Sequence, residues 1–179
     1  MFDLSKMGDT VRLLSIDPGS TTTGFALWEV SFSTGAILSV QTWTFNAGDV
    51  LFPMFQPDGY GDLLRRLECL RNEVYATLSR HQPLAVMCES PFFARSQPNA
   101  FEVLVAVLNT IRHAVNVYYA NTRPLFIVDP STAKRTFGVK GTGKEVVRDA
   151  LLRHHDVVVK LNKQPFQLSE HEVDAVAVG

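Results

Sequence analysis

Three acidic residues stand where a strand or a helix could direct them into one site. Asp17 follows the apolar run Val11–Ile16, and Glu89 follows the apolar run Leu84–Cys88. If these runs are neighbouring parallel strands, both carboxylates lie at the carboxyl edge of the sheet, where open α/β sheets place ligands. Asp174 precedes an apolar stretch, an unusual setting for a solvated acid, and His171 lies one helical turn before it on the same face.

Carboxylates that gather at one site repel one another, so their functional interpretation is cation binding. Oxygen ligands suit Mg²⁺ and Mn²⁺, and a histidine in the set widens the choice towards Mn²⁺. Two such ions, about 3.5–4 Å apart, can activate a water and stabilise the leaving oxygen in phosphodiester cleavage. Two alternatives stay open: each acid could cap its own turn or helix, or Glu170 and Glu172 could be the active residues.

The elements that must position these residues form an alternating pattern. Apolar and β-branched runs predict strands, the turn Asp17-Pro18-Gly19-Ser20 ends the first of them, and residues 47–61 are typical of a loop. Three strands are expected first, followed by helices in alternation with further strands, which indicates an α/β fold with a mixed central sheet flanked by helices. The predicted strands are Val11–Ile16, Gly24–Val30, Ile37–Phe45, Leu84–Cys88 and Leu125–Val128.

Helical spacing and capping signals predict the remaining elements. Helices are expected over Asp62–His81 and Asn99–Ala120, from Pro130, from Thr142 to about His155, and from Ser169 through Val178. The helix Asn99–Ala120 is apolar on both faces, a pattern that predicts burial on two sides. Within the strand that precedes Glu89, alternation places Ala85, Met87 and Glu89 on one face.

Composition bounds the class of protein. The 179 residues suit one domain over 1–179, and 46% apolar with 20% charged residues is typical of a globular protein. We expect no membrane span and no secretory signal, and the two cysteines favour a reduced, cytoplasm-like compartment, bacterial or that of a virus's host.

The charge distribution is uneven. A net charge of −1 argues mildly against a nucleic-acid partner. However, the stretch Ser131–Lys163 is locally basic, which predicts either a nucleic-acid surface or an ordinary solvated helix face. It carries Lys134, Arg135, Lys140, Lys144, Arg148, Arg153, Lys160 and Lys163 against Glu145, Asp149 and Asp156.

Three motifs, in order, resemble those of the RuvC-like Holliday-junction resolvases. Ile16-Asp17-Pro18-Gly19-Ser20, followed by Thr23-Gly24, resembles the opening motif of that family. Val86-Met87-Cys88-Glu89-Ser90-Pro91-Phe92 resembles its second element, and His171-Glu172-Val173-Asp174-Ala175-Val176-Ala177 resembles its last. Each motif is short, but the ordered set spans nearly the whole chain.

The resemblance implies a ribonuclease H-like domain that cuts four-way DNA junctions in pairs as a homodimer, with Mg²⁺ or Mn²⁺. It implies that Asp17, Glu89, His171 and Asp174 hold two metal ions per active site. Many members carry Asp in place of His171, and the near-neutral charge and the loop Ala47–Gly61 also depart from familiar members. These departures leave flaps, other branched DNA and RNA open as substrates.

Residues around the expected site are candidates for DNA contact. Lys144 stands at an expected helix start and is a candidate for stabilising the transition state. Phe92 and Phe93 share a Pro-bounded loop, where one ring could stack on an unpaired base or pack under the loop. The full set of expected DNA contacts is Phe92, Phe93, Arg95, Lys134, Arg135, Lys140 and Lys144.

The doubly apolar helix is the candidate dimer interface, because a two-fold dimer matches a substrate with two-fold symmetry. The alternative is that both faces are buried inside one subunit. The residues expected at the interface are Phe101, Val103, Leu104, Val107, Leu108 and Ile111.

Other functions share part of this pattern. Actin-like and sugar-kinase-like nucleotide binders also open with a strand followed by Asp-x-Gly-Ser/Thr, but they need a second phosphate loop and a second domain. A junction-binding module without catalysis is a further alternative. It is disfavoured because a pure binder gains nothing from carboxylates that face phosphates.

Overall fold

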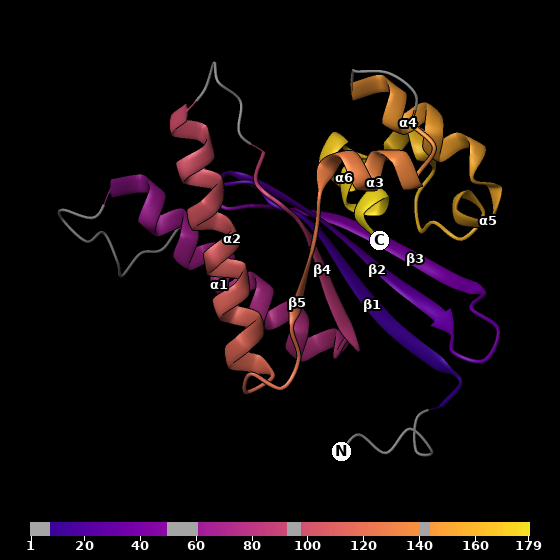
Figure 1. Cartoon of the computed structure of the whole chain (residues 1–179), viewed down its shortest axis with the longest axis horizontal. Helices are drawn as coiled ribbons and strands as arrows, with labels where there is room; N and C mark the ends of the chain where they lie inside the picture. Colours follow the sequence, from indigo (N-terminus) through magenta and orange to yellow (C-terminus); the bar gives the residue numbers. More distant parts are fainter. Residues whose placement is uncertain (1–7, 50–60, 93–97, 140–143) are drawn as a thin grey trace.

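A five-stranded mixed sheet forms the centre of the protein in the computed structural model, which describes residues 8–49, 61–92, 98–139 and 144–179 (Figure 1). The strand order is β3-β2-β1-β4-β5. β1 pairs antiparallel with β2 and parallel with β4, and β4 pairs parallel with β5. The predicted mixed sheet and the parallel pairing of the two acid-bearing strands are confirmed. The strands are β1 Thr10–Asp17, β2 Thr22–Ser31, β3 Ile37–Asn46, β4 Ala85–Glu89 and β5 Leu125–Val128.

Helices cover the two faces of the sheet unequally. The two long helices α1 and α2 lie together on one face, and the short helices gather on the other (Figure 1). The expected helices are all present, and the short α5 and η2 were not expected. The helices are α1 Gly61–His81, α2 Pro98–Tyr118, α3 Pro130–Thr136, α4 Lys144–Arg153, α5 His155–Val158, η2 Pro165–Gln167 and α6 Glu170–Val178.

Two apolar cores follow from the alternation of the strands. Leu14 and Ile16 of β1 belong to the core beneath α1 and α2, together with Val86 and Cys88 of β4. Ser15 and Asp17 therefore point to the opposite face, on which α6 lies. The second core packs under α4 and α6 around Ala26, Trp28 and Val40. Asp17 thus ends β1 on the side of the sheet that α6 covers.

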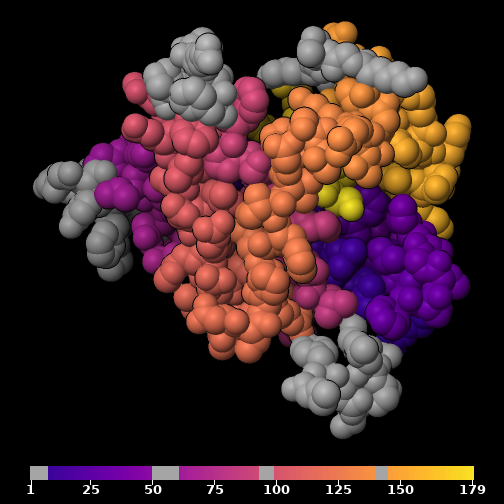
Figure 2. Space-filling view, viewed as in Figure 1, coloured from indigo at the N-terminus to yellow at the C-terminus, as the bar shows by residue number. Residues whose placement is uncertain are grey.

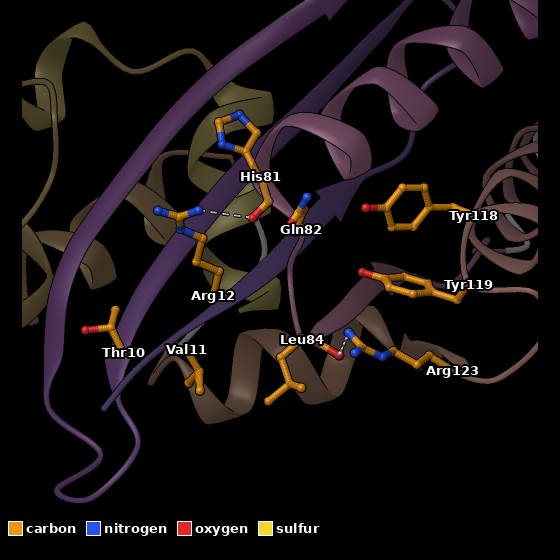
Figure 3. Close-up of a pocket in the computed structure, with 9 residues that line it drawn as sticks. All are labelled: Thr10, Val11, Arg12, His81, Gln82, Leu84, Tyr118, Tyr119 and Arg123. Atoms are coloured by element: carbon orange, nitrogen blue, oxygen red, sulfur yellow. Dashed lines mark hydrogen bonds between the residues drawn. The ribbon is translucent and has the colours of Figure 1, made fainter. Parts of the chain in front are cut away.

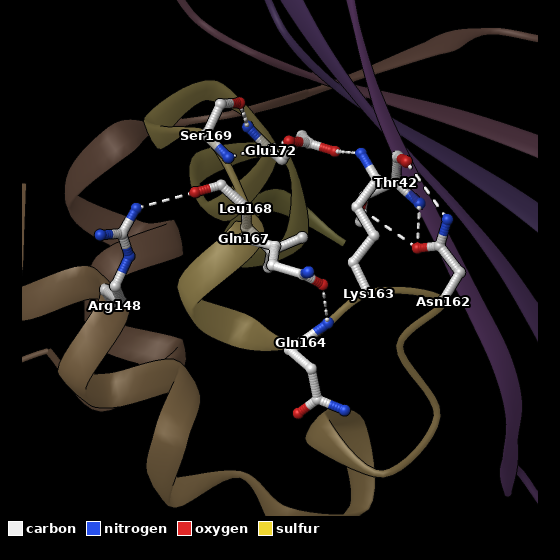
Figure 4. Close-up of polar contacts among 9 residues, drawn as sticks. All are labelled: Thr42, Arg148, Asn162, Lys163, Gln164, Gln167, Leu168, Ser169 and Glu172. Atoms are coloured by element: carbon white, nitrogen blue, oxygen red, sulfur yellow. Dashed lines mark hydrogen bonds and ion pairs between the residues drawn. The ribbon is translucent and has the colours of Figure 1, made fainter.

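The N-terminus of α6 is fixed by a closed set of polar contacts (Figure 4). The Ser169 hydroxyl accepts from the Glu172 amide at 3.1 Å, and the Ser169 amide donates to Glu172 Oε2 at 2.8 Å. Glu172 Oε1 also pairs with Lys163 Nζ at 2.5 Å. Burial acts to raise the pKa of Glu172, but the contacts with Lys163 and Ser169 outweigh it and hold the pKa below its usual value. Glu172 is therefore an anchor of α6, which accounts for this one of the two acids that the sequence left open as an alternative.

Further hydrogen bonds tie α6 and the segment before it to the sheet. The buried Ser15 hydroxyl donates to the Ala175 carbonyl at 2.7 Å and accepts from Trp28 Nε1 at 3.0 Å. Asn162 Oδ1 accepts from the amide of Thr42 in β3 at 3.0 Å (Figure 4). Buried hydroxyls and amides must form hydrogen bonds to avoid a desolvation cost, so these contacts specify one position of α6 on the sheet.

A glycine lets α6 approach the sheet closely. Gly24 pairs with Asp17 across β1 and β2. A Cβ atom built on Gly24 would lie 2.0 Å from the backbone oxygen of His171. No side chain larger than hydrogen fits there without moving the first turn of α6.

α2 differs from its prediction, because only one of its faces is buried. Val107, Ile111, Ala114 and Val115 pack into the core, whereas Val103 is only half-buried and Val117 is exposed. Within the described residues, α2 is also the one helix whose length and apolar composition would allow it to cross a membrane, contrary to expectation. Core helices pass the same test, and α2 packs on α1. The capping box expected at Thr142 lies outside the described residues.

The close approach at Gly24 makes a prediction about stability. Gly24→Ala should lower the free energy of unfolding by about 1–3 kcal/mol, because the added methyl group overpacks the contact with His171. Urea unfolding followed by circular dichroism measures this. Gly8→Ala is the matched control, since a Cβ there meets nothing within 4 Å. Equal stability of the two variants would contradict the close packing of α6 against Gly24.

Candidate active site

Asp17 and Glu89 lie side by side at the carboxyl edge of the sheet. Ile16 and Cys88 are partners in the parallel pairing of β1 and β4, so the next residue of each strand continues the register. Val86 and Cys88 are buried in the core, which confirms the predicted alternation and turns Glu89 towards the face of α6. The carboxyl groups of Glu89 and Asp17 lie close enough to raise the pKa of Glu89.

α6 adds His171 and Asp174 to this edge. His171 Nδ1 lies 2.7 Å from Asp17 Oδ2. Asp174, one turn further along α6, is half-buried, and its charge and that of Asp17 act on each other. The structure therefore brings together the four residues that the sequence singled out, with Asp17, 8% exposed, at their centre.

Burial and mutual repulsion change the protonation of these acids. Burial raises the pKa of Glu89 to about 8, and the Asp17 carboxylate and that of Asp174 add to the rise. Burial and the charge of Asp17 likewise raise the pKa of Asp174 to about 6. The hydrogen bond to Asp17 raises the pKa of His171. At neutral pH Glu89 therefore holds a proton that an ordinary carboxylate would have released.

These residues fit a hard divalent cation by donor type and by charge. Carboxylate oxygens suit Mg²⁺ and Mn²⁺, and retained protons mark a place where positive charge is favoured. Within the described residues, no group of three or more His, Cys, Asp or Glu side chains already has metal-ligand spacing. Instead, Asp17 links Glu89 on one side to His171 on the other, so a cation would have to take the place of these two contacts.

A cleft of about 520 Å³ opens beside Asp17 and Glu89. Phe92, which is 68% exposed, forms part of its wall, as predicted for a ring available for stacking. Lys134 also lines the cleft, and its charge opposes the pKa rise of both Glu89 and Asp174. The cleft is completed by Pro18, Ser90, Pro91, Leu104, Asp129, Pro130 and Ser131.

The other residues expected near DNA are only partly described. Arg135 is exposed on α3, next to Lys134. α4 begins at Lys144, as expected for a helix start, but the Lys144 side chain lies outside the described part of the chain. Phe93, Arg95 and Lys140 also lie outside the described residues.

The expected dimer interface needs a correction. Val107, Leu108 and Ile111 are buried in the core of their own subunit, so their side chains are not available to a partner. Val107, Leu108 and Ile111 lie on the face of α2 that packs into the core of its own subunit. Phe101, Val103 and Leu104 are half-buried, and Leu104 lines the cleft.

Asp129 is a cleft residue that sequence reasoning treated only as a helix cap. It follows β5, whose last residue Val128 is the parallel partner of Glu89. Acids thus end or directly follow three adjacent parallel strands at one edge: Asp17 and Glu89 end β1 and β4 in register, and Asp129 comes one residue after the partner of Glu89. This shared edge was a usable signal, because carboxyl ends of parallel strands meet at one edge.

A second cavity, of about 640 Å³, lies at the opposite edge of the sheet (Figure 3). Its polar groups hold chain segments together. Arg12 donates to the His81 carbonyl at 3.3 Å, and Arg123 donates to the carbonyls of Pro83 and Leu84 at 3.1 and 3.3 Å. The Tyr119 hydroxyl also donates to Pro83. This cavity therefore has a structural role at the ends of α1 and α2.

Comparison with known proteins supports one fold. No protein-family model matches the sequence, and no curated protein matches it. RuvC of Thermus thermophilus superposes with a TM-score of 0.64 and 22% identity, covering 94% of this chain and 90% of RuvC. The yeast mitochondrial Holliday junction resolvase Ydc2 gives 0.65 and 10%, covering 97% and 78%. The fowlpox virus Holliday junction resolvase gives 0.51 and 10%, covering 94% of each chain. With its mixed sheet and flanking helices, the chain has the ribonuclease H-like fold of the RuvC-like Holliday junction resolvases.

Proposed function

We propose that this protein is a divalent-metal-dependent endonuclease that cuts branched DNA, chiefly four-way junctions. The observation that carries the proposal is the convergence of Asp17, Glu89 and Asp174 at one sheet edge, at the mouth of a cleft. The Holliday junction resolvases that share the fold support the choice of substrate, among them a Thermus thermophilus RuvC solved with a Holliday junction.

Asp17, Glu89, Asp174 and His171 would hold Mg²⁺ or Mn²⁺, two ions per site. When bound, such ions activate a water and stabilise the leaving oxygen of a phosphodiester. The alternative that each acid merely caps its own element is disfavoured, because a cap gains nothing from burial against a second carboxylate. A buried unbalanced charge is costly, and a cation is the ligand that removes this cost.

The chain's own residues supply contacts to DNA. Lys134 lines the cleft and attracts a phosphate towards the acids. Phe92 offers an exposed ring to an unpaired base, a contact worth about 1–3 kcal/mol. Lys144, at the first position of α4, is proposed to stabilise negative charge in the transition state. Arg135, Phe93, Arg95 and Lys140 complete the proposed DNA-binding set.

A homodimer would place one active site at each of the two strands that are cut in a four-way junction. The half-buried Val103 and the exposed Val117 leave an apolar strip on α2. Phe126 of β5 is 50% exposed. β5, in orange, adjoins α2 on the face of the molecule that Figure 2 shows. We propose that two copies of the protein pair through this surface, and not through the buried residues Val107, Leu108 and Ile111. A cytoplasmic site of action is part of the same proposal.

The first prediction concerns the central acid. Asp17→Asn should slow cleavage of a four-way junction by at least about a hundredfold, because outer partners of metal ligands alone contribute about 10–100-fold. Single-turnover cleavage with Mg²⁺, with Mn²⁺ and with chelator measures this, on junction, flap, linear duplex and RNA substrates. Asp149→Asn, an exposed acid on α4, is the control and should cut normally. A fully active Asp17→Asn would exclude the proposed site.

The second prediction concerns pH. The pKa of Glu89 is about 8 in the folded protein against 4.5 without perturbation, so the folded protein keeps a proton that the unfolded chain releases. Without metal, this contribution to stability is complete below pH 4.5 and is lost as the pH rises through 8. Unfolding free energies in chelator should therefore fall with pH for the parent and fall less for Glu89→Gln. Added Mg²⁺ should stabilise the parent at pH 8 or above and leave Glu89→Gln nearly unchanged. Parallel curves for the two proteins would refute this account.

The third prediction concerns assembly. Val103→Asp should convert a dimer into a monomer, because a charge in an apolar interface is not compensated. Sedimentation velocity over a range of concentrations measures the mass, and Glu102→Gln, at an exposed neighbouring position, is the control. A parent protein whose mass is that of a monomer at every concentration rules out the proposed dimer.

A further inference from the structure

We propose that the cleft beside Asp17 and Glu89 receives one unpaired base of the DNA, and that Asp129 selects this base by accepting a hydrogen bond from its exocyclic amino group. The inference rests on the proposed function and names the feature of a branch that the site prefers. It assigns Asp129 to substrate choice, separately from the acids that are proposed to hold metal.

The cleft is large enough to admit a base and has suitable lining residues. Its volume of about 520 Å³ lies within the range of small-molecule pockets, about 300–1,000 Å³. One wall carries the exposed ring of Phe92, and Leu104 of α2 adds an apolar surface. Lys134 lines the same cleft and can pair with the phosphate attached to that base. A flat ring with a phosphate next to it matches these three contacts.

Asp129 contributes a fixed acceptor to the cleft. Its Oδ1 accepts from the Ser131 amide at 2.9 Å, from the Thr132 amide at 3.2 Å and from the Ser131 hydroxyl. Among the described residues, Oδ2 accepts no hydrogen bond. The contacts with Ser131 and Thr132 lower the pKa of Asp129, so the carboxylate stays charged. One oxygen thus orients the group, and the other remains available to a ligand.

Within DNA, the groups that can donate a hydrogen bond to a carboxylate such as Asp129 belong to the bases. The sugar–phosphate backbone of an internal nucleotide offers acceptors and negative charge, which a carboxylate repels. Hydrogen-bond donors in DNA lie on base edges, and Asp accepts from the cytosine amino group in known readout. Adenine, cytosine and guanine carry an exocyclic amino group, whereas thymine presents carbonyl oxygens on both sides of its ring N–H. Thymine is therefore the base that this cleft accepts least well.

The position of Asp129 links base choice to the position of the cut. Asp129 follows β5, and β5 is the parallel neighbour of β4, which ends at Glu89. Both residues line the cleft. A base held by Asp129 would therefore sit next to the phosphate that the site would cleave, so its identity should affect cleavage as well as binding.

The experiment uses four immobile four-way junctions that differ only in one unpaired base at the crossover. Binding of the metal-free protein and single-turnover cleavage with Mg²⁺ are both measured. For the parent, we expect the thymine junction to bind and be cut about ten- to a hundredfold less well than the other three, the size expected for one hydrogen bond to a charged acceptor.

Asp129→Asn is the decisive variant. Asparagine keeps the oxygen that caps α3 but places an amide donor where the free Oδ2 stood, so the preference should turn towards thymine. Asp129→Ser keeps a capping oxygen without the reach, and the preference should disappear. A role limited to capping α3 would leave the preference unchanged in both variants. Thermal unfolding verifies that each variant is folded.

Equal binding and equal cutting of the four junctions by the parent would overturn the assignment of Asp129, and so would an unchanged preference in Asp129→Asn. Folded parent protein that binds the junctions but cuts none of them with Mg²⁺ or Mn²⁺ would overturn the proposed nuclease. The binding series would then still decide the role of Asp129. The two proposals therefore fail by different results.

Discussion

The packing of α6 against the sheet is the contact on which the rest of the site depends. Two of the four candidate ligands lie on α6, and the other two end β1 and β4. Each step that brings α6 closer also brings like charges together, which costs free energy. Gly24 permits the approach, Ser15 and Trp28 fasten it, and the Lys163–Glu172 pair holds the first turn of the helix. The raised pKa values of Glu89 and Asp174 are the electrostatic consequence of this position of α6.

One face of the sheet carries the main apolar core, and the other carries the candidate active site. Under α1 and α2 lies a continuous apolar core, with Leu14, Ile16, Val86 and Cys88 almost fully buried. The opposite face carries the polar contacts that fix α6 and, at its edge, the acids. Because side chains alternate along a strand, one run of residues serves both needs: Ile16 anchors β1 while Asp17, its neighbour, faces the site. The rigid strand thereby holds its acid in place, as precise sites require.

The sequence predicted those features of the fold and the site that depend on residues close together in the chain. Asp17 and Glu89 were predictable because each follows a short apolar run, and the alternation before Glu89 placed its side chain correctly. His171 and Asp174 were predictable from helical spacing. Val107, Leu108 and Ile111 were assigned wrongly because a helix that is apolar all round does not reveal which face the sheet covers. The pair Lys163–Glu172 was missed since its partners come from a loop and a helix whose meeting is set by tertiary packing. Asp129 was recognised as a cap, and only the pairing of β5 with β4 shows that it shares an edge with the acids.

The hydrogen bond between Asp17 and His171 joins positions 154 residues apart in the chain. During translation, β1 and β4 leave the ribosome long before α6 is synthesised. A nascent chain that stalls ahead of α6, or a fragment released by a protease, therefore contains two of the four acid-site residues and lacks the others. Premature products of this gene are thus expected to lack the complete acid site, because His171 and Asp174 join it only after α6 has been synthesised.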